Sequence, residues 1–285
     1  MLCKNNWIDV SWDGLPSRRG KENLQVTFYQ KTESIKSFQT VCDHVAIEIA
    51  GQHSNLFLAL SGGSDSEHIA NVLLRNKIQF TPLIVDYDHC HDPEVVEENW
   101  WAKHWCKQHK IQPVIVKSNE YIGSLSEKQR FLHVKARLLH GVITAGIIHD
   151  VVTMHQGTLL TGNQLEYYPD YEQMTYLESQ LGDYEGFVMQ ESDMYNEILA
   201  PNQHPWAFYY WNADIVAAFV DEWNTGFTIQ ENKAAIYGTS PRPKIGYRSN
   251  FPKYLHNRHL LARSFGDRDV AMLGTKQSLL EKLVK

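Results

Sequence analysis

Largely apolar runs separated by helical patterns dominate the middle of the chain. These runs occupy positions 56–60, 81–86 and 112–116. Between them, apolar residues recur every three or four positions, first from Ile69 onward and again after Pro93. Strands buried in a parallel sheet read as continuous apolar runs, and the helices that connect them are amphipathic. Residues 56–117 therefore predict a βαβαβ unit with right-handed crossovers.

The flanking segments show other periodicities. Residues 7–29 alternate loosely between apolar and polar positions around a turn, which predicts a hairpin. Residues 34–51 carry a helical stripe with Cys42 on its apolar face, and residues 125–150 also have a largely helical pattern. Further along we expect a strand at 158–160, a helix through 215–223 and a short amphipathic helix from 275. The expected fold class is α/β.

The first apolar run ends in the string Ser61-Gly62-Gly63-Ser64-Asp65-Ser66. Paired glycines let backbone N–H groups approach an anion closely, and the following helix adds the positive end of its dipole. Asp65 supplies a carboxylate of the kind that holds Mg²⁺ beside phosphates. No Gly-Lys-Ser/Thr follows, so the string is not a Walker A loop. An ordinary glycine-rich turn is the alternative, but the complete string favours a phosphate site.

Polar residues also follow two other predicted strands. Asp86 closes the strand at 81–86, and the turn Thr161-Gly162-Asn163-Gln164-Leu165-Glu166 follows the strand at 158–160. In open α/β sheets, ligands bind at the carboxyl ends of the strands. Ser61 and Asp86 both fall at that edge of the predicted sheet.

The Ser61–Ser66 string resembles the pyrophosphate-binding loop (PP-loop) of the ATP-pyrophosphatase family, which includes NAD, GMP and asparagine synthetases and tRNA-lysidine synthetase. The resemblance covers about residues 54–168. It implies a doubly wound, Rossmann-like parallel sheet with an N-terminal hairpin extension and a mostly helical C-terminal lobe. The expected divisions are a β extension at 1–33, an ATP-binding core at 34–170 and a substrate or lid region at 171–285.

The resemblance also implies roles for individual residues. Ser61 to Ser66 would bind the β,γ-pyrophosphate of ATP, Asp65 and Glu166 would hold Mg²⁺, and Val85 and Asp86 would line the adenosine pocket. Thr161 and Gly162 would face the first loop, and Arg137 would approach the phosphates, although a surface salt bridge is an equal alternative for it. The Gly-His-His-x-Asp-Asp and Gly-x-Asp-Glu patterns of two subfamilies are absent, so the subfamily stays unassigned.

A rigid basic loop lies beyond the stretch that the resemblance covers. A pyrophosphate leaving group needs cations to offset its developing charge. Lys244, Arg248 and Lys253 are the candidates, and Lys244 and Lys253 join Asp65 as expected catalytic residues. A solvated basic loop is the alternative interpretation of each of them.

Composition limits the kinds of molecule that the protein is expected to bind. The net charge of −6 over 285 residues argues against a long nucleic-acid footprint, which needs a basic face. Four cysteines form no C-x-x-C pair, so neither a zinc ribbon nor a dithiol site is indicated, and any role of Cys90 stays open. Without a signal sequence or a bilayer-length apolar run, we expect a cytoplasmic protein. The high aromatic content is compatible with a homodimer.

The sequence therefore predicts an ATP- and Mg²⁺-dependent ligase that forms AMP and pyrophosphate. Its substrate would be a small molecule or nucleobase, adenylated on a carboxylate or carbonyl oxygen for displacement by ammonia, an amine or sulfur. A tRNA-modifying enzyme of the same family and a relative of adenylylsulfate reductases are the alternatives. A non-enzymatic nucleotide-binding protein is a more remote one.

Overall fold

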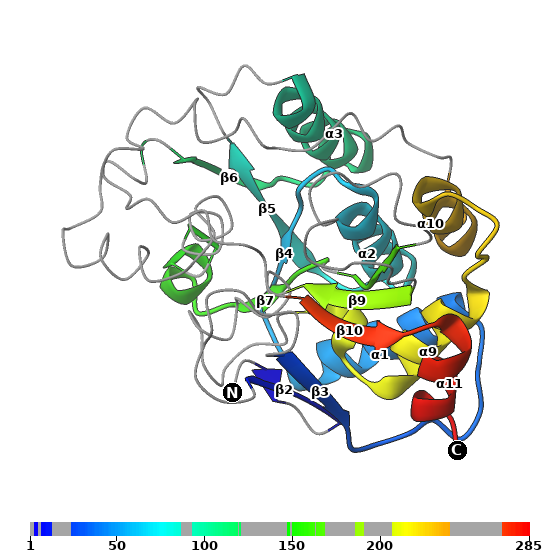
Figure 1. The fold of residues 1–285 in the computed structure, drawn as a ribbon. Coiled ribbons are helices and arrows are strands. Elements are labelled where there is room, and N and C mark those ends of the chain that lie inside the picture. The colour runs from blue at the N-terminus through cyan, green and yellow to red at the C-terminus, as the bar shows by residue number, and fades with distance from the viewer. Residues whose placement is uncertain are drawn as a thin grey trace.

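A parallel four-stranded sheet forms the centre of the computed structural model (Figure 1). Its strands are β4 (Leu56–Ala59), β5 (Phe80–Asp86), β6 (Val114–Lys117) and β7 (Thr158–Leu160), in the order β6-β5-β4-β7. The structure describes residues 3–4, 7–12, 24–86, 93–118, 120, 147–148, 150–162, 164–168, 186–190, 207–239 and 270–285. Every strand pair in this sheet is parallel, which confirms the predicted βαβαβ unit.

Successive strands are added to opposite sides of β4, so the strand order of the sheet reverses at this strand. Leu58 pairs with Pro82 of β5 on one side and with Leu160 of β7 on the other. The units after β4 extend toward β6, whereas β7 returns to the opposite edge of β4. Such a switch point opens a crevice outside the carboxyl ends of the two neighbouring strands, and this is where doubly wound sheets bind ligands.

Helices α1 (Phe38–Gln52), α2 (Ser64–Arg75) and α3 (Pro93–His109) follow the predicted stripes. Ser37 caps α1 by accepting from the N–H of Thr40, and the buried face of α1 includes Cys42, as the pattern predicted. Most of the helix predicted at 125–150 lies outside the described residues. No helix in the described part of the chain combines the length and apolarity that crossing a bilayer requires.

The N-terminal extension is an antiparallel sheet of β1 (Cys3–Lys4), β2 (Ile8–Trp12) and β3 (Leu24–Phe28). Ile8 pairs with Phe28 and Trp12 with Leu24, which confirms the predicted hairpin. Trp7 is buried, and its indole N–H donates to the carbonyl of Tyr210 at 2.9 Å. The extension is therefore joined to the C-terminal half of the chain.

The C-terminal part contains strands as well as helices. A second antiparallel sheet has the order β10-β9-β8, from β8 (Glu166–Tyr168), β9 (Gly186–Gln190) and β10 (Val270–Gly274). The helical elements are η3 (Phe208–Tyr210), α9 (Ala213–Glu222), α10 (Ile229–Tyr237) and α11 (Lys276–Leu283). The boundary expected at residue 170 falls between the paired strands β8 and β9.

The C-terminal helices pack directly on the core. Helix α9 lies against α1, and α10 lies against both α1 and α2. Phe38 and Phe219 meet at 5.6 Å between ring centroids, and both are fully buried. Helix α10 is therefore brought against α2, the helix that starts at the glycine loop.

Candidate functional site

The Ser61–Ser66 loop lies at the switch point of the sheet. It connects the end of β4 with the start of α2, as the sequence predicted. Gly62 has a φ of 88°, a left-handed conformation that favours glycine, and Gly63 is the extended N-cap of α2. The positive φ of Gly62 thus makes the tight turn possible.

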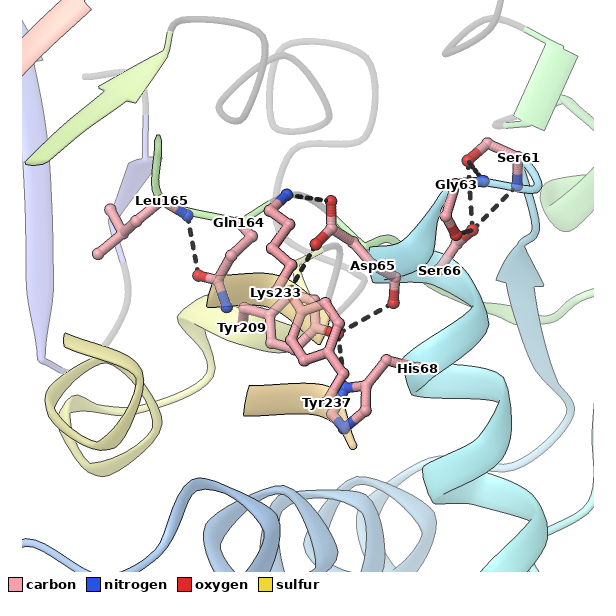
Figure 2. Close-up of polar contacts among 10 residues, drawn as sticks. All are labelled: Ser61, Gly63, Asp65, Ser66, His68, Gln164, Leu165, Tyr209, Lys233 and Tyr237. Carbon is pink, nitrogen blue, oxygen red and sulfur yellow. Dashed lines mark hydrogen bonds and ion pairs between the residues drawn. The ribbon is translucent and has the colours of Figure 1, made fainter. Parts of the chain in front are cut away.

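Two serines close the loop on itself (Figure 2). The hydroxyls of Ser61 and Ser66 are 3.2 Å apart, and the Ser66 hydroxyl also donates to the carbonyl of Gly63 at 3.1 Å. The backbone N–H of Ser61 donates to Ser66, and that of Gly63 donates to Ser61, each at 3.2 Å. These hydrogen bonds from the two serine side chains fix the shape of the loop backbone.

The second glycine turn packs against the first. A Cβ atom on Gly162 would lie 2.9 Å from the backbone nitrogen of Ser66 and 3.0 Å from its Cα. Only a residue without a side chain fits at this distance. The two motifs that the sequence singled out therefore meet across the switch point between β4 and β7.

Gln164 in the same turn is buried. Its side-chain oxygen accepts from the N–H of Leu165 at 2.8 Å, which fixes the orientation of the amide. Its Nε2 has no hydrogen-bond partner within the described structure.

Asp65 is held from three directions by the C-terminal part of the chain. Lys233 Nζ lies 2.6 Å from Oδ2, and the Tyr237 hydroxyl lies 2.5 Å from Oδ1. The Tyr209 hydroxyl donates to the backbone carbonyl of Asp65 at 2.9 Å. Figure 2 shows these groups converging on the start of α2 from η3 and α10.

Sequence reasoning missed Lys233 and both tyrosines. The signal for α10 is the Thr-x-x-Glu string at Thr228 and Glu231, which forms a capping box in the structure. That string locates a helix start, but nothing in it indicates that Lys233 faces a loop 168 positions earlier.

Burial sets the protonation of the groups around Asp65. Burial and the nearby Asp65 charge raise the pKa values of Tyr209 and Tyr237 well above the usual value, so both hydroxyls keep their protons. Burial lowers the pKa of His68, which bonds to Tyr209, to about 3. Near neutral pH His68, Tyr209 and Tyr237 are therefore all uncharged.

This arrangement suits an anion such as pyrophosphate. The first turn of a helix leaves N–H groups without intrahelical partners, and the N-cap Gly63 has no side chain to satisfy them. Lys233 adds a positive charge on a side chain that is only 10% exposed.

A resident metal centre is not formed by the described residues alone. They contain no group of three or more histidine, cysteine or acidic side chains that could hold a metal ion. Both carboxylate oxygens of Asp65 already accept from Lys233 and Tyr237. Mg²⁺ commonly binds through one or two carboxylates together with substrate phosphates. Asp65 would have to give up one of these two contacts to become such a ligand, and its role in holding Mg²⁺ stays a prediction.

Asp86 lies at the carboxyl end of β5, as predicted, but its carboxylate bonds to α3. Lys103 Nζ is 2.6 Å from one oxygen, and the amide of Asn99 is 3.1 Å from the other. Val85 is buried in the sheet beside it. Their role in an adenosine pocket stays a prediction.

Several expected site residues cannot be placed relative to the loop. Glu166 belongs to β8, paired with Val188, but its side chain is outside the described structure. The residues that lie wholly outside it are Cys90, Arg137, Lys244, Arg248 and Lys253.

The described residues form an α/β fold with a glycine-rich loop at the switch point of its parallel sheet, and the string of that loop resembles the pyrophosphate-binding loop of the ATP-pyrophosphatase family. No protein-family model and no curated protein match the chain. Among solved structures, U34-tRNA thiolase NcsA from Methanococcus maripaludis is 20% identical, with 44% of each chain covered and a TM-score of 0.34.

Two synthetases are also similar. NH3-dependent NAD synthetase from Campylobacter jejuni is 14% identical, with 45% of this chain and 55% of that chain covered and a TM-score of 0.34. NMN synthetase from Francisella tularensis is 16% identical, with 81% and 98% covered and a TM-score of 0.35. The chain thus spans about half the length of the first two proteins.

Proposed function

We propose that this chain is an ATP-dependent enzyme that cleaves ATP to AMP and pyrophosphate while activating a second substrate. The observation that carries the proposal is the serine-closed glycine loop at the switch point, with Gly162 packed on Ser66 and Lys233 paired to Asp65. The loop offers uncapped helix N–H groups and a cation to the same anion.

The proposed reaction is the adenylation of a carboxylate or carbonyl oxygen. The substrate oxygen forms a bond to the α-phosphorus of ATP, and the bond between that phosphorus and the α,β-bridging oxygen breaks. The bridging electron pair leaves with pyrophosphate. Ammonia, an amine or a sulfur nucleophile then displaces AMP from the activated carbon and loses a proton. A carboxylate substrate is already deprotonated near neutral pH, so the first step needs no general base.

The residues of the loop support the leaving group. As the bond to the α-phosphorus breaks, negative charge grows on the β-phosphate, and preorganised donors stabilise this charge most effectively. The N–H groups at the start of α2 and the ammonium of Lys233 are such donors. Lys233 thus joins Lys244 and Lys253, which remain predictions, as a cation for the pyrophosphate.

Asp65 is the described residue that would hold Mg²⁺, and the ion would neutralise phosphate charge. Its carboxylate must then exchange the Lys233 or Tyr237 hydrogen bond for the ion. Where the Lys233 bond is the one given up, the ammonium of Lys233 would be released toward the phosphates. The ion pair with Asp65 therefore holds the Lys233 ammonium next to the proposed pyrophosphate site.

The nucleotide product tests the proposal. The protein is incubated with α-labelled MgATP and pooled carboxylate, amide and nucleobase substrates, and the labelled product is identified. We expect AMP with release of pyrophosphate, whereas labelled ADP as the product would contradict the proposal.

Two variants connect the product to the site. Asp65→Asn should abolish AMP formation. Asp43→Asn is the matched control, because Asp43 pairs with Arg75 at 2.6 Å on the surfaces of α1 and α2 and has no role in the proposed site. Undiminished AMP formation by Asp65→Asn would show that the loop does not act as proposed.

A further inference from the structure

A series of three hydrogen-bonding groups lies beneath the first turn of α2. The Tyr209 hydroxyl is 2.9 Å from the carbonyl oxygen of Asp65 and 2.8 Å from Nδ1 of His68. Asp65 and His68 are one turn apart on α2, whereas Tyr209 comes from η3. Figure 2 shows Tyr209 between these two groups of the helix.

The direction of each hydrogen bond follows from chemistry. A carbonyl oxygen only accepts, so the Tyr209 hydroxyl donates its proton to Asp65. Its oxygen then accepts from His68, which places the proton of the neutral imidazole on Nδ1. Because burial holds the pKa of His68 near 3 and raises that of Tyr209, neither group changes its protonation state near neutrality. The series therefore runs in one direction, from His68 through Tyr209 to Asp65.

The carbonyl that Tyr209 holds belongs to the same peptide group as the N–H of Ser66. A peptide group is planar, so fixing the oxygen also fixes the direction of the N–H. This N–H lies in the first turn of α2, among the donors that an anion at the helix start would use. Gly162 borders the same nitrogen, with a Cβ position 2.9 Å away.

Aromatic stacking holds the imidazole in place. The ring of His68 lies 4.4 Å from that of Tyr237 at 11° and 5.6 Å from that of Phe38 at 21°. All three side chains are buried. Packing alone would be satisfied by phenylalanine at position 209, because the hydroxyl adds little volume. The hydrogen-bond series is thus a feature that core packing does not require.

We infer that Tyr209 is a positioning residue for the pyrophosphate site, oriented by His68 and acting through the Asp65–Ser66 peptide. The inference rests on the proposed function and adds a requirement outside the loop. Tyr209 contacts no phosphate in this arrangement; it sets the direction of a donor that does. Without the hydroxyl, the carbonyl keeps only its intrahelical hydrogen bond, so the peptide is held less firmly and the N–H group of Ser66 is less well aligned with the anion.

Binding of inorganic pyrophosphate in the presence of Mg²⁺, measured by calorimetry, tests this role. Tyr209→Phe should weaken binding about tenfold, the equivalent of one hydrogen bond. Tyr29→Phe is the matched control, because it removes a hydroxyl that bonds to Asp9 at an exposed site. The control should bind as the wild type does.

Each outcome has a distinct meaning. Equal binding by Tyr209→Phe and the wild type would overturn the inference and leave the proposed function standing. If the wild type does not bind pyrophosphate, the proposed pyrophosphate site and the inference about Tyr209 are both contradicted. A merely structural role would lower the melting temperature of Tyr209→Phe without changing the affinity of the folded protein.

A second pair of variants keeps the test decisive if Tyr209→Phe does not fold. His68→Asn retains an amide donor near the position of Nδ1, whereas His68→Phe retains the stacked ring but has no donor. We expect pyrophosphate binding near the wild-type level for His68→Asn and severalfold weaker for His68→Phe. Equal affinities in the two variants would contradict the orienting role of His68.

Discussion

The ammonium of Lys233 lies 2.6 Å from the carboxylate of Asp65, although the two residues are 168 positions apart in the chain. Asp65 belongs to the glycine loop, and Lys233 belongs to α10. The pair directly connects the recognisable loop with the C-terminal part of the chain. It places a positive charge at the proposed pyrophosphate site from a helix that carries no recognisable motif.

Replacing Lys233 by methionine tests the role of this charge. Methionine preserves most of the buried volume but removes the ammonium, so pyrophosphate binding should weaken by about 10- to 100-fold, as expected for loss of a charged hydrogen bond. The change leaves the partly buried Asp65 with its Tyr237 hydrogen bond but without its ion partner, which should lower the free energy of unfolding by about 1–3 kcal/mol. Calorimetry and urea denaturation measure the two effects separately.

Lys103→Met is the control for Lys233→Met. Lys103 also forms a 2.6 Å ion pair, with Asp86, but its side chain is 41% exposed. An exposed pair contributes about 0–1 kcal/mol, so the stability loss should stay below that of Lys233→Met. Equal losses of pyrophosphate affinity in both variants would mean that general charge, not the position of Lys233, controls binding.

The close contact between the two glycine turns leads to a prediction about Gly162. Alanine at this position would bring Cβ to 2.9 Å from Ser66 N and 3.2 Å from the carbonyl carbon of Asp65, both backbone atoms. One turn must move, which should cost about 1–3 kcal/mol of stability and at least tenfold in pyrophosphate affinity.

Gly51→Ala is the matched control for Gly162→Ala. Gly51 lies near the end of α1, and a Cβ atom there would have no other group within 4 Å. Alanine should stabilise this helix position by up to about 1 kcal/mol and leave binding unchanged. Wild-type pyrophosphate affinity in Gly162→Ala would mean that the second turn does not shape the site.

Asp86 offers a way to separate nucleotide binding from pyrophosphate binding. If its carboxylate contributes to the adenosine pocket, Asp86→Asn should weaken ATP binding and leave pyrophosphate binding unchanged. Equal binding of ATP by the variant and the wild type would assign Asp86 to the structural contact with Lys103 and Asn99 alone. Calorimetric competition between ATP and pyrophosphate measures the two affinities in the wild type and the variant.

Local signals predicted the parts of the fold that depend on local sequence. The strand at 56–59 is an uninterrupted apolar run, and the strand at 80–86 is a largely apolar one. The loop between β4 and α2 has a glycine where φ is positive. The hairpin of β2 and β3 follows from alternation. Each of these features is encoded within a few neighbouring residues, so one sequence is enough to identify it.

The remaining site depends on contacts between distant segments. Tyr209, Lys233 and Tyr237 reach Asp65 only because α9 and α10 pack on α1 and α2. The helical elements that carry them have no distinctive sequence pattern, and nothing in the sequence distinguishes these residues from its other lysines and tyrosines. Strands β8 and β9 were missed for the same reason, since short strands gain their stability from partners far along the chain.

The buried imidazole of His68 predicts how stability depends on pH. Burial lowers its pKa in the folded protein from 6.5 to about 3. Between these two values the unfolded chain binds a proton that the folded protein excludes, so acidification favours unfolding. The contribution of His68 to the free energy of unfolding should be constant above about pH 7. Below the pKa of His68 in the unfolded chain, this contribution should fall by roughly 1.4 kcal/mol per pH unit, down to about pH 3.

Carboxylates also titrate in this range, so the measurement is the difference in urea-unfolding free energy between wild type and His68→Asn at pH 4, 5, 6 and 7. Because asparagine has no titrating group, the wild type should lose its advantage over the variant as the pH falls from 7 to 4. A difference that is independent of pH would mean that His68 is protonated as readily in the folded protein as in the unfolded chain, and the buried, neutral donor to Tyr209 would then be excluded.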